Sequence, residues 1–288
     1  MNFSKRHQAT AVSAAVIAVA AGGAGLAATD AGAHPAAKKP AVVIHAKVTK
    51  QTVKLDRDSV RAGRVTFEVT APKGDHTLQV AQLHDGYTPD QLGPDADAGL
   101  EKGDLDAIQR LDTNVTWLGG VEVRRGKAGE FTVLLKKAGE YFIADQNGNG
   151  AAVLTVKGTA VKRQSAALDG TFAAVDGSRW DAPKSVQHNG WIRLKNTSDQ
   201  PHFMVLNEVK KSTTKKDVKA YFSSGAEGEP AFGLKHYASS GVFSPGANVT
   251  FHLQHVPAGK YLLMCFWPDK ETGMPHAAMG MWRLVTLK

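Results

Sequence analysis

The 288-residue sequence contains a single cysteine, Cys265, which cannot form an internal disulfide and so excludes a disulfide scaffold. No two histidines are spaced as His-x-His, the pairing that holds a trinuclear copper cluster. Aromatic residues are 7% of the chain and do not alternate with lysines, so nucleic-acid binding is not expected. Beyond the N-terminal region, no apolar run is long enough to span a bilayer.

The N-terminus has the layout of a secretory signal peptide. Lys5 and Arg6 precede an Ala/Val/Gly-rich run, which ends in the small-residue motif at residues 31–33. We therefore expect a signal peptide at 1–33, a flexible tail at 34–41, and a secreted or extracytoplasmic protein at the cell envelope or outside the cell. A membrane anchor is the alternative reading of this run.

Cleavage would leave about 255 residues, enough for two domains of ordinary size. The formal charge would fall from +8 to about +7. A basic chain favours an acidic partner protein or an anionic cell-envelope surface. Cleavage would also make His34 the first residue, and an amino-terminal histidine can chelate copper.

From Val42 onward, short alternating or β-branched runs are separated by Gly, Pro, Asn and Asp. This pattern predicts many strands at short spacing and hence a sandwich or barrel. Asn189-Gly190 predicts a tight hairpin between residues 185–187 and the run that begins at Trp191. Two segments have a helical pattern, around 104–108 and around 216–221.

The two halves of the chain resemble each other. The run 63–69 matches 190–196, 75–80 matches 201–206, and 138–145 matches 258–265, in the same order. Such agreement indicates a duplicated unit. We expect domains at 42–160 and 161–288, joined near 157–167.

Candidate metal ligands gather in the second unit. His202 follows a turn that leads into a predicted strand, and Cys265 ends the last strand but one. His276 and Met281 lie in the loop after Cys265, and Met281 directly precedes the final strand. Two imidazoles, one thiolate and a thioether are the ligands of a mononuclear blue copper site. Taken singly, each residue also fits a structural role: a turn histidine, a buried thiol or a core methionine.

This order of residues resembles the cupredoxins, including plastocyanin, azurin and the copper domain of copper nitrite reductase. The motif Gly-x-Tyr-x-x-x-Cys at 259–265, and the positions of Asn196 and His202, carry the resemblance over about the last hundred residues. It implies an all-β protein of two tandem Greek-key cupredoxin-like β-sandwiches with short helical insertions. It also implies one copper ion held by His202, Cys265, His276 and Met281, with Met279 as the alternative axial ligand.

The first unit lacks this set. His76 matches His202, but Asp145 stands where Cys265 would be, and neither histidine nor methionine follows it closely. Without a thiolate there is no blue copper site. We expect a structural or docking domain in which His76 and His84 are solvated.

The absence of His-x-His makes oxidase activity unexpected, so we predict a non-enzymatic protein. The resemblance implies one-electron transfer, with an exposed edge of His276 as the exit for electrons and with Phe266, Trp267 and Trp282 shielding the thiolate. Copper storage or delivery is the second hypothesis. An interaction module without metal is the third.

Overall fold

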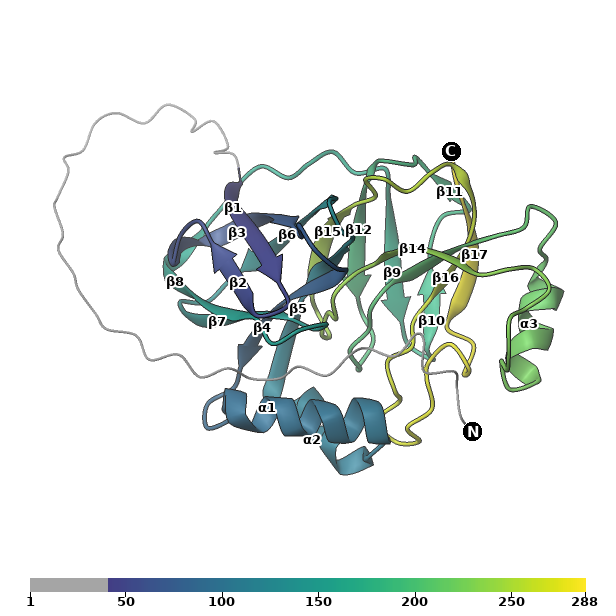
Figure 1. The fold of residues 1–288 in the computed structure, drawn as a ribbon, viewed down its shortest axis with the longest axis horizontal. Coiled ribbons are helices and arrows are strands. Elements are labelled where there is room, and N and C mark those ends of the chain that lie inside the picture. The colour runs from purple at the N-terminus through teal and green to yellow at the C-terminus, as the bar shows by residue number, and fades with distance from the viewer. Residues whose placement is uncertain (1–40) are drawn as a thin grey trace, which may run out of the picture.

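The computed structural model describes residues 41–288 (Figure 1). The predicted signal peptide, nearly all of the predicted tail, and His34 lie outside this range. Within residues 41–288, none of the helices has the length and apolar character needed to cross a membrane.

The protein is mainly β-structure. The strands of the N-terminal half are β1 (Val42–Thr49), β2 (Thr52–Leu55), β3 (Ser59–Thr70), β4 (His76–Leu83), β5 (Val115–Val123), β6 (Ala128–Leu135), β7 (Gly139–Asp145) and β8 (Ala151–Val161). Those of the C-terminal half are β9 (Gly170–Val175), β10 (Arg179–Asp181), β11 (Ser185–Val186), β12 (Trp191–Asn196), β13 (Val205–Val209), β14 (Lys235–Ser239), β15 (Asn248–His252), β16 (Gly259–Met264) and β17 (Trp282–Leu287). The prediction of an all-β fold with short helices is confirmed.

The same strand pairings occur in both halves. β1 runs parallel to β3, which pairs antiparallel with β6, and β9 and β15 flank β12 in the same way. β4 lies between β5 and β7, just as β13 lies between β14 and β16. β7 then pairs with β8, and β16 with β17. The domain boundary near residue 160 remains a prediction.

The two halves are joined by a continuous sheet. β6 pairs antiparallel with β15, at Phe131 opposite Phe251 and Thr132 opposite Thr250. One 12-stranded sheet therefore contains the whole N-terminal half together with β9, β10, β12 and β15. A second sheet has the order β11-β17-β16-β13-β14 and carries the elements next to the candidate ligands. Figure 1 shows the strands of both halves standing side by side.

The predicted hairpin at Asn189-Gly190 is wrong. β11 pairs in parallel with β17, whereas β12 pairs with β9 and β15 in the other sheet. Asn189 does adopt a left-handed conformation, with φ 58°. The turn at residues 189–190 separates β11 from β12 and takes the chain from one sheet to the other. In the N-terminal half the corresponding segment is a single strand, β3, whose first residues pair with β8 and whose later residues pair with β6.

Both predicted helices are present, and a further helical segment was missed. The helices are α1 (Pro89–Ala96), the π-helical turn η1 (Asp97–Glu101), α2 (Leu105–Asn114) and α3 (Lys215–Ser223). Asp104 caps the N-terminus of α2, and its carboxylate accepts a hydrogen bond from the Ala107 N–H at 3.1 Å. α1 escaped prediction because Gly93 and Pro94 lie inside it, and both residues oppose helix formation.

One large apolar core spans both halves, and a smaller cluster lies near α3. Phe67 and Phe131 stack at 5.2 Å as register partners on β3 and β6, and Cys265 and Met281 belong to the same core. The candidate ligands therefore lie inside the packed interior of the sandwich.

Gln79 on β4 links the halves through a buried polar contact. Its amide nitrogen donates to the carbonyl oxygens of Gly119 at 3.2 Å and Val242 at 3.0 Å, and its amide oxygen accepts from the Val242 N–H at 2.7 Å. A buried backbone group that loses its partner costs about 1–3 kcal/mol.

We expect Gln79→Leu to lower the free energy of unfolding by about 3 kcal/mol, because it leaves the Val242 backbone N–H and three carbonyls, those of Val80, Gly119 and Val242, without this partner. Gln82→Leu, on the same strand but only half-buried, should cost less than about 1 kcal/mol. Urea unfolding measures both. Equal losses in the two variants would contradict this role of Gln79.

Candidate metal centre

Three predicted ligands converge on one point. The two Nδ1 atoms of His202 and His276 are 3.1 Å apart, and the Cys265 Sγ lies 3.6 Å from the first and 3.8 Å from the second. A point equidistant from three atoms at these separations lies about 2.0 Å from each. Metal bonds to imidazole and thiolate are about 2.0–2.3 Å long. The donor atoms and their spacing therefore fit a single metal ion.

Strand ends position two of the ligands, and a loop positions the third. Cys265 directly follows β16, and His276 lies in the loop that connects β16 to β17. His202 lies just before β13, where it forms an isolated bridge with Phe243. β13 and β16 are antiparallel neighbours, with Val205 opposite Met264, so the pairing brings His202 beside Cys265.

The turn before His202 sets its ring. The Ser198 hydroxyl lies 2.7 Å from the His202 Nε2 and 2.8 Å from the Asn196 side-chain oxygen. That oxygen can only accept, so Ser198 donates to Asn196 and accepts from the Nε2–H of His202. The remaining nitrogen, Nδ1, then carries a free lone pair directed at the site. Sequence analysis missed Ser198, although its position two residues after Asn196 is typical of a residue in a polar turn.

Cys265 is fully buried, and burial raises the pKa of its thiol to about 12. The Phe203 backbone N–H donates to the sulfur at 3.4 Å and opposes this shift. In the absence of metal the thiol is therefore neutral at pH 7. Metal binding must displace its proton.

Burial also keeps both imidazoles neutral. It lowers the pKa of His202 to about 2, with a further contribution from the neighbouring His276, and lowers the pKa of His276 to about 4. Neutral imidazole is the form that binds metals. The expected exposed edge of His276 is wrong, since the residue is 0% exposed and its Nε2 is buried without a hydrogen-bond partner among residues 41–288.

The loop that carries His276 is closed by its own backbone. Ala277 N–H donates to the Cys265 oxygen at 2.7 Å, His276 N–H to the Trp267 oxygen at 3.0 Å, and Met281 N–H to the His276 oxygen at 2.8 Å. These bonds fix the separation between the thiol and the second imidazole without any metal.

Asp269 ties this loop to the turn of His202. Its carboxylate accepts hydrogen bonds from Thr272 N–H at 2.9 Å and from the Gln200 amide at 2.8 Å, while the Gln200 oxygen accepts from Lys270 N–H at 2.9 Å. Burial works to raise the pKa of Asp269, but its hydrogen bonds outweigh that and lower it. Both ligand loops thus form one hydrogen-bonded unit.

The methionines differ in exposure. Met281 is fully buried, and its carbonyl oxygen accepts the Cys265 N–H at 3.3 Å, whereas Met279 is 43% exposed. Met274 is also exposed.

Aromatic rings surround the ligands. Trp180 lies 6.4 Å from the His202 ring between centroids, and Trp267 is buried with its ring edge-on to Trp117 at 6.2 Å. Phe266 and Trp282 are only partly buried, in the cluster near α3. Trp180 was missed because it lies on β10, far from the ligands in sequence.

The equivalent place in the N-terminal half holds an ion pair, and the expectation that His76 is solvated is wrong. His76 is buried, with its Nδ1 2.7 Å from the Asp145 carboxylate and its Nε2 2.8 Å from the Lys73 oxygen. Asp145 also accepts the Thr77 N–H at 3.2 Å. His84 is exposed as expected. The carboxylate that replaces the thiol and the Lys73 carbonyl oxygen thus satisfy both ring nitrogens of the histidine.

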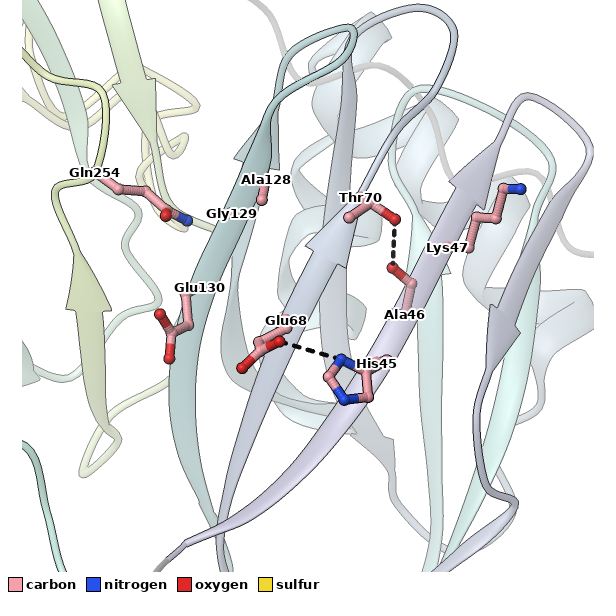
Figure 2. A pocket seen from close by; sticks show the side chains of 9 residues that line it. All are labelled: His45, Ala46, Lys47, Glu68, Thr70, Ala128, Gly129, Glu130 and Gln254. Atoms are coloured by element: carbon pink, nitrogen blue, oxygen red, sulfur yellow. Dashed lines mark hydrogen bonds and ion pairs between the residues drawn. The ribbon is translucent and has the colours of Figure 1, made fainter.

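A histidine and two carboxylates line a surface pocket (Figure 2). His45 contacts Glu68 at 3.1 Å, and Glu130 and Gln254 border the same pocket. Glu130 also contacts His252, at 3.2 Å, which is not among the residues that line the pocket. These are two separate pairs. Among residues 41–288, the set that converges closely enough to hold a metal ion is His202, Cys265 and His276.

We expect Ser198→Ala to lower copper affinity about 10- to 100-fold, because His202 loses the hydrogen bond that fixes its ring and tautomer. Thr197→Val, which removes the neighbouring hydroxyl that donates to the Ala174 oxygen, is the matched control. Competition with a copper chelator measures both affinities. Equal affinities for the two variants would contradict the role of Ser198.

The metal-free protein should lose stability as the pH falls below about 6.5, the ordinary pKa of histidine. The folded state holds His202 and His276 neutral, so each takes up a proton only on unfolding and contributes about 1.4 kcal/mol per pH unit. His276→Gln should reduce this slope between pH 6.5 and 5, whereas the exposed His188→Gln should not. Denaturant unfolding at several pH values measures it, and an unchanged slope in His276→Gln would contradict the assignment.

No protein-family model matches the chain, and no curated protein matches it. Among solved structures, a dithionite-reduced auracyanin from the photosynthetic bacterium Roseiflexus castenholzii is similar at 23% identity, covering 41% of this chain and 94% of that protein, with a TM-score of 0.26. Auracyanin B is similar at 19% identity, covering 44% and 92%, with a TM-score of 0.26. Auracyanin A, a "blue" copper protein from Chloroflexus aurantiacus, is similar at 20% identity, covering 41% and 96%, with a TM-score of 0.25.

The candidate site is defined by the geometry of the chain itself. Its C-terminal half is a β-sandwich in which His202, Cys265 and His276 come from the predicted strand ends and meet at bonding range. Two imidazoles and a thiolate around one point are the equatorial ligands of a mononuclear blue copper site. The C-terminal half therefore combines a β-sandwich with a ligand set of the kind that holds a single copper ion.

Proposed function

We propose that the protein binds one copper ion through His202, Cys265, His276 and Met281 and transfers single electrons outside the cytoplasm. The observation that carries this proposal is the convergence of the two Nδ1 atoms and the Sγ atom at 3.1–3.8 Å. A copper ion bound there supplies one-electron redox chemistry.

The metal-free arrangement supports electron transfer. Backbone hydrogen bonds close the loop of His276, and Gln200 and Asp269 link that loop to the turn of His202. Ligands that are held in place before the metal arrives move little when its charge changes, which favours rapid electron transfer. The apolar surroundings exclude water from the thiolate and tune its potential.

Met281 is the better candidate for the axial position. It is buried in the same core as Cys265 and its backbone bonds to both Cys265 and His276, while Met279 is largely exposed. A weak thioether ligand completes the coordination expected of a blue site.

Copper delivery remains the second candidate, and ligand burial argues against it. A protein that hands over its metal needs at least one ligand within reach of the acceptor, yet His202, Cys265 and His276 are at most 1% exposed. Slow loss of copper to a chelator would agree with electron transfer. Rapid loss would favour delivery.

We propose a carrier rather than an enzyme. The sequence has no His-x-His pair, and the part of the chain that the structure describes contains one convergent metal-ligand set. The signal-like segment at 1–33 supports secretion, and the basic charge supports an acidic redox partner or an anionic envelope surface.

We further propose that residues 42–160 and 161–288 are duplicated domains, of which the first has a structural role. The repeated strand pairings support duplication. The buried His76–Asp145 contact, in the place that corresponds to His202 and Cys265, supports the structural role.

Copper loading of the protein, followed by visible and EPR spectra, tests the proposal. We expect one copper per chain, an intense blue absorption band from the thiolate, and loss of that band in Cys265→Ser. Met279→Leu should leave the spectrum unchanged, whereas Met281→Leu should shift it. A Cys265→Ser spectrum identical to that of the unmodified protein would remove Cys265 from the site and overturn the proposal.

A further inference from the structure

Asp112 is a buried carboxyl that the proposed site does not use. It lies on α2 of the N-terminal half, and both of its oxygens are inaccessible to solvent and have no hydrogen-bond partner of normal geometry among residues 41–288. Burial raises the pKa of Asp112 to about 7. An unsatisfied buried carboxyl is costly, so its retention points to a role beyond packing.

The group that faces this carboxyl is the indole of Trp267. The Trp267 Nε1–H is also buried without a partner of normal geometry in the described chain, and its proximity partly offsets the raised pKa of Asp112. A modest side-chain movement would complete a hydrogen bond between these two orphaned groups. Each is the natural partner of the other, since the indole can only donate and a carboxylate accepts.

Trp267 contacts two of the copper ligands through its backbone. Its carbonyl oxygen accepts the His276 N–H at 3.0 Å, and its own N–H is directed at the Cys265 thiol, whose pKa it helps to lower. A displacement of Trp267 therefore alters the positions of both the thiol and the second imidazole.

Helix α2 lies against the ligand loop at further points. The Gln109 side chain donates to the Lys270 oxygen at 3.1 Å, and Leu105 lies 3.1 Å from the position that a Cβ on Gly273 would occupy. In Figure 1, α2 runs beside the loop that leads into β17. Helix α2 of the N-terminal half thus contacts the loop that carries His276 directly.

We propose that Asp112 is a positioning residue for the copper site: its carboxyl accepts the Trp267 indole hydrogen, and its protonation state sets the reduction potential. This inference rests on the proposed function. Deprotonated Asp112 places a negative charge near the site, which stabilises the more positive oxidised state. The potential should therefore rise as the pH falls and Asp112 takes up a proton.

The other charged groups around Asp112 keep their charge in this pH range. Lys270 on the ligand loop attracts it, and Asp199 and Asp269 repel it. The ion pair between Lys270 and Asp199 raises the pKa of the lysine and lowers that of the aspartate, and the pKa of Asp269 is also lowered. Asp112 is therefore the carboxyl of this group that changes charge near neutral pH.

The metal-free protein gives a test that is independent of copper. Tryptophan fluorescence is measured between about pH 5.5 and 8.5, a range that spans the Asp112 pKa. We expect a transition with a midpoint near 7 that is absent from both Asp112→Asn and Trp267→Phe. Asp106→Asn, at an exposed position on the same helix, should retain it. A pH-independent signal in the unmodified protein would overturn the inference.

The copper-loaded protein tests the effect on the site. The reduction potential of the unmodified protein should rise as the pH falls through 7, whereas Asp112→Asn should show a flatter profile near the low-pH value. Identical profiles would overturn the inference. If no copper binds but the fluorescence transition persists, the proposed function and the effect on potential fail, while the Asp112–Trp267 contact stands.

Discussion

The structure depends on one constraint: the imidazoles of His202 and His276 and the thiol of Cys265 are buried away from water, and they must still point at one another. Burial costs a polar group its hydration unless another group replaces it. Here Ser198 satisfies one ring and the Phe203 N–H contacts the sulfur, but the inner nitrogens face each other at 3.1 Å. That separation is a hydrogen-bonding distance between two neutral rings, and the packing of the surrounding sandwich holds the rings there, where a metal ion would take the place of the shared hydrogen.

The N-terminal half shows how the same framework is satisfied without a metal. Asp145 takes the place that corresponds to Cys265 and binds His76 directly, and the short turn after it supplies no second histidine and no methionine. The tight turn after Asp145 has no room for a side chain at Gly148, because a Cβ there would lie 2.4 Å from the Asp145 carboxylate. The two halves share the same strand pairings but differ in the residues at the strand ends. The strands therefore provide stability, and the residues at their ends decide whether a metal can bind.

Much of this arrangement is readable from the sequence, because strand alternation and ligand order are local properties. The β-rich fold, α2, α3 and the three converging ligands were predicted in this way. The burial of His276 and of His76 was not, since each depends on partners distant in sequence. The Asn189-Gly190 turn was misread because a turn signal does not state which sheet the next strand joins. No spacing in the sequence predicts that Ser198, Trp180 and Asp112 lie near the candidate site, because only the folded chain brings them there.

The pairing of β6 with β15 has a consequence for how the protein folds and evolves. A strand edge that is covered in the intact chain becomes an open template for aggregation when its neighbour is removed. The halves are therefore expected to unfold as one cooperative unit, and neither could be lost without exposing that edge. The N-terminal half, which contributes no residue to the convergent ligand set among residues 41–288, therefore remains necessary as a scaffold for the half that does.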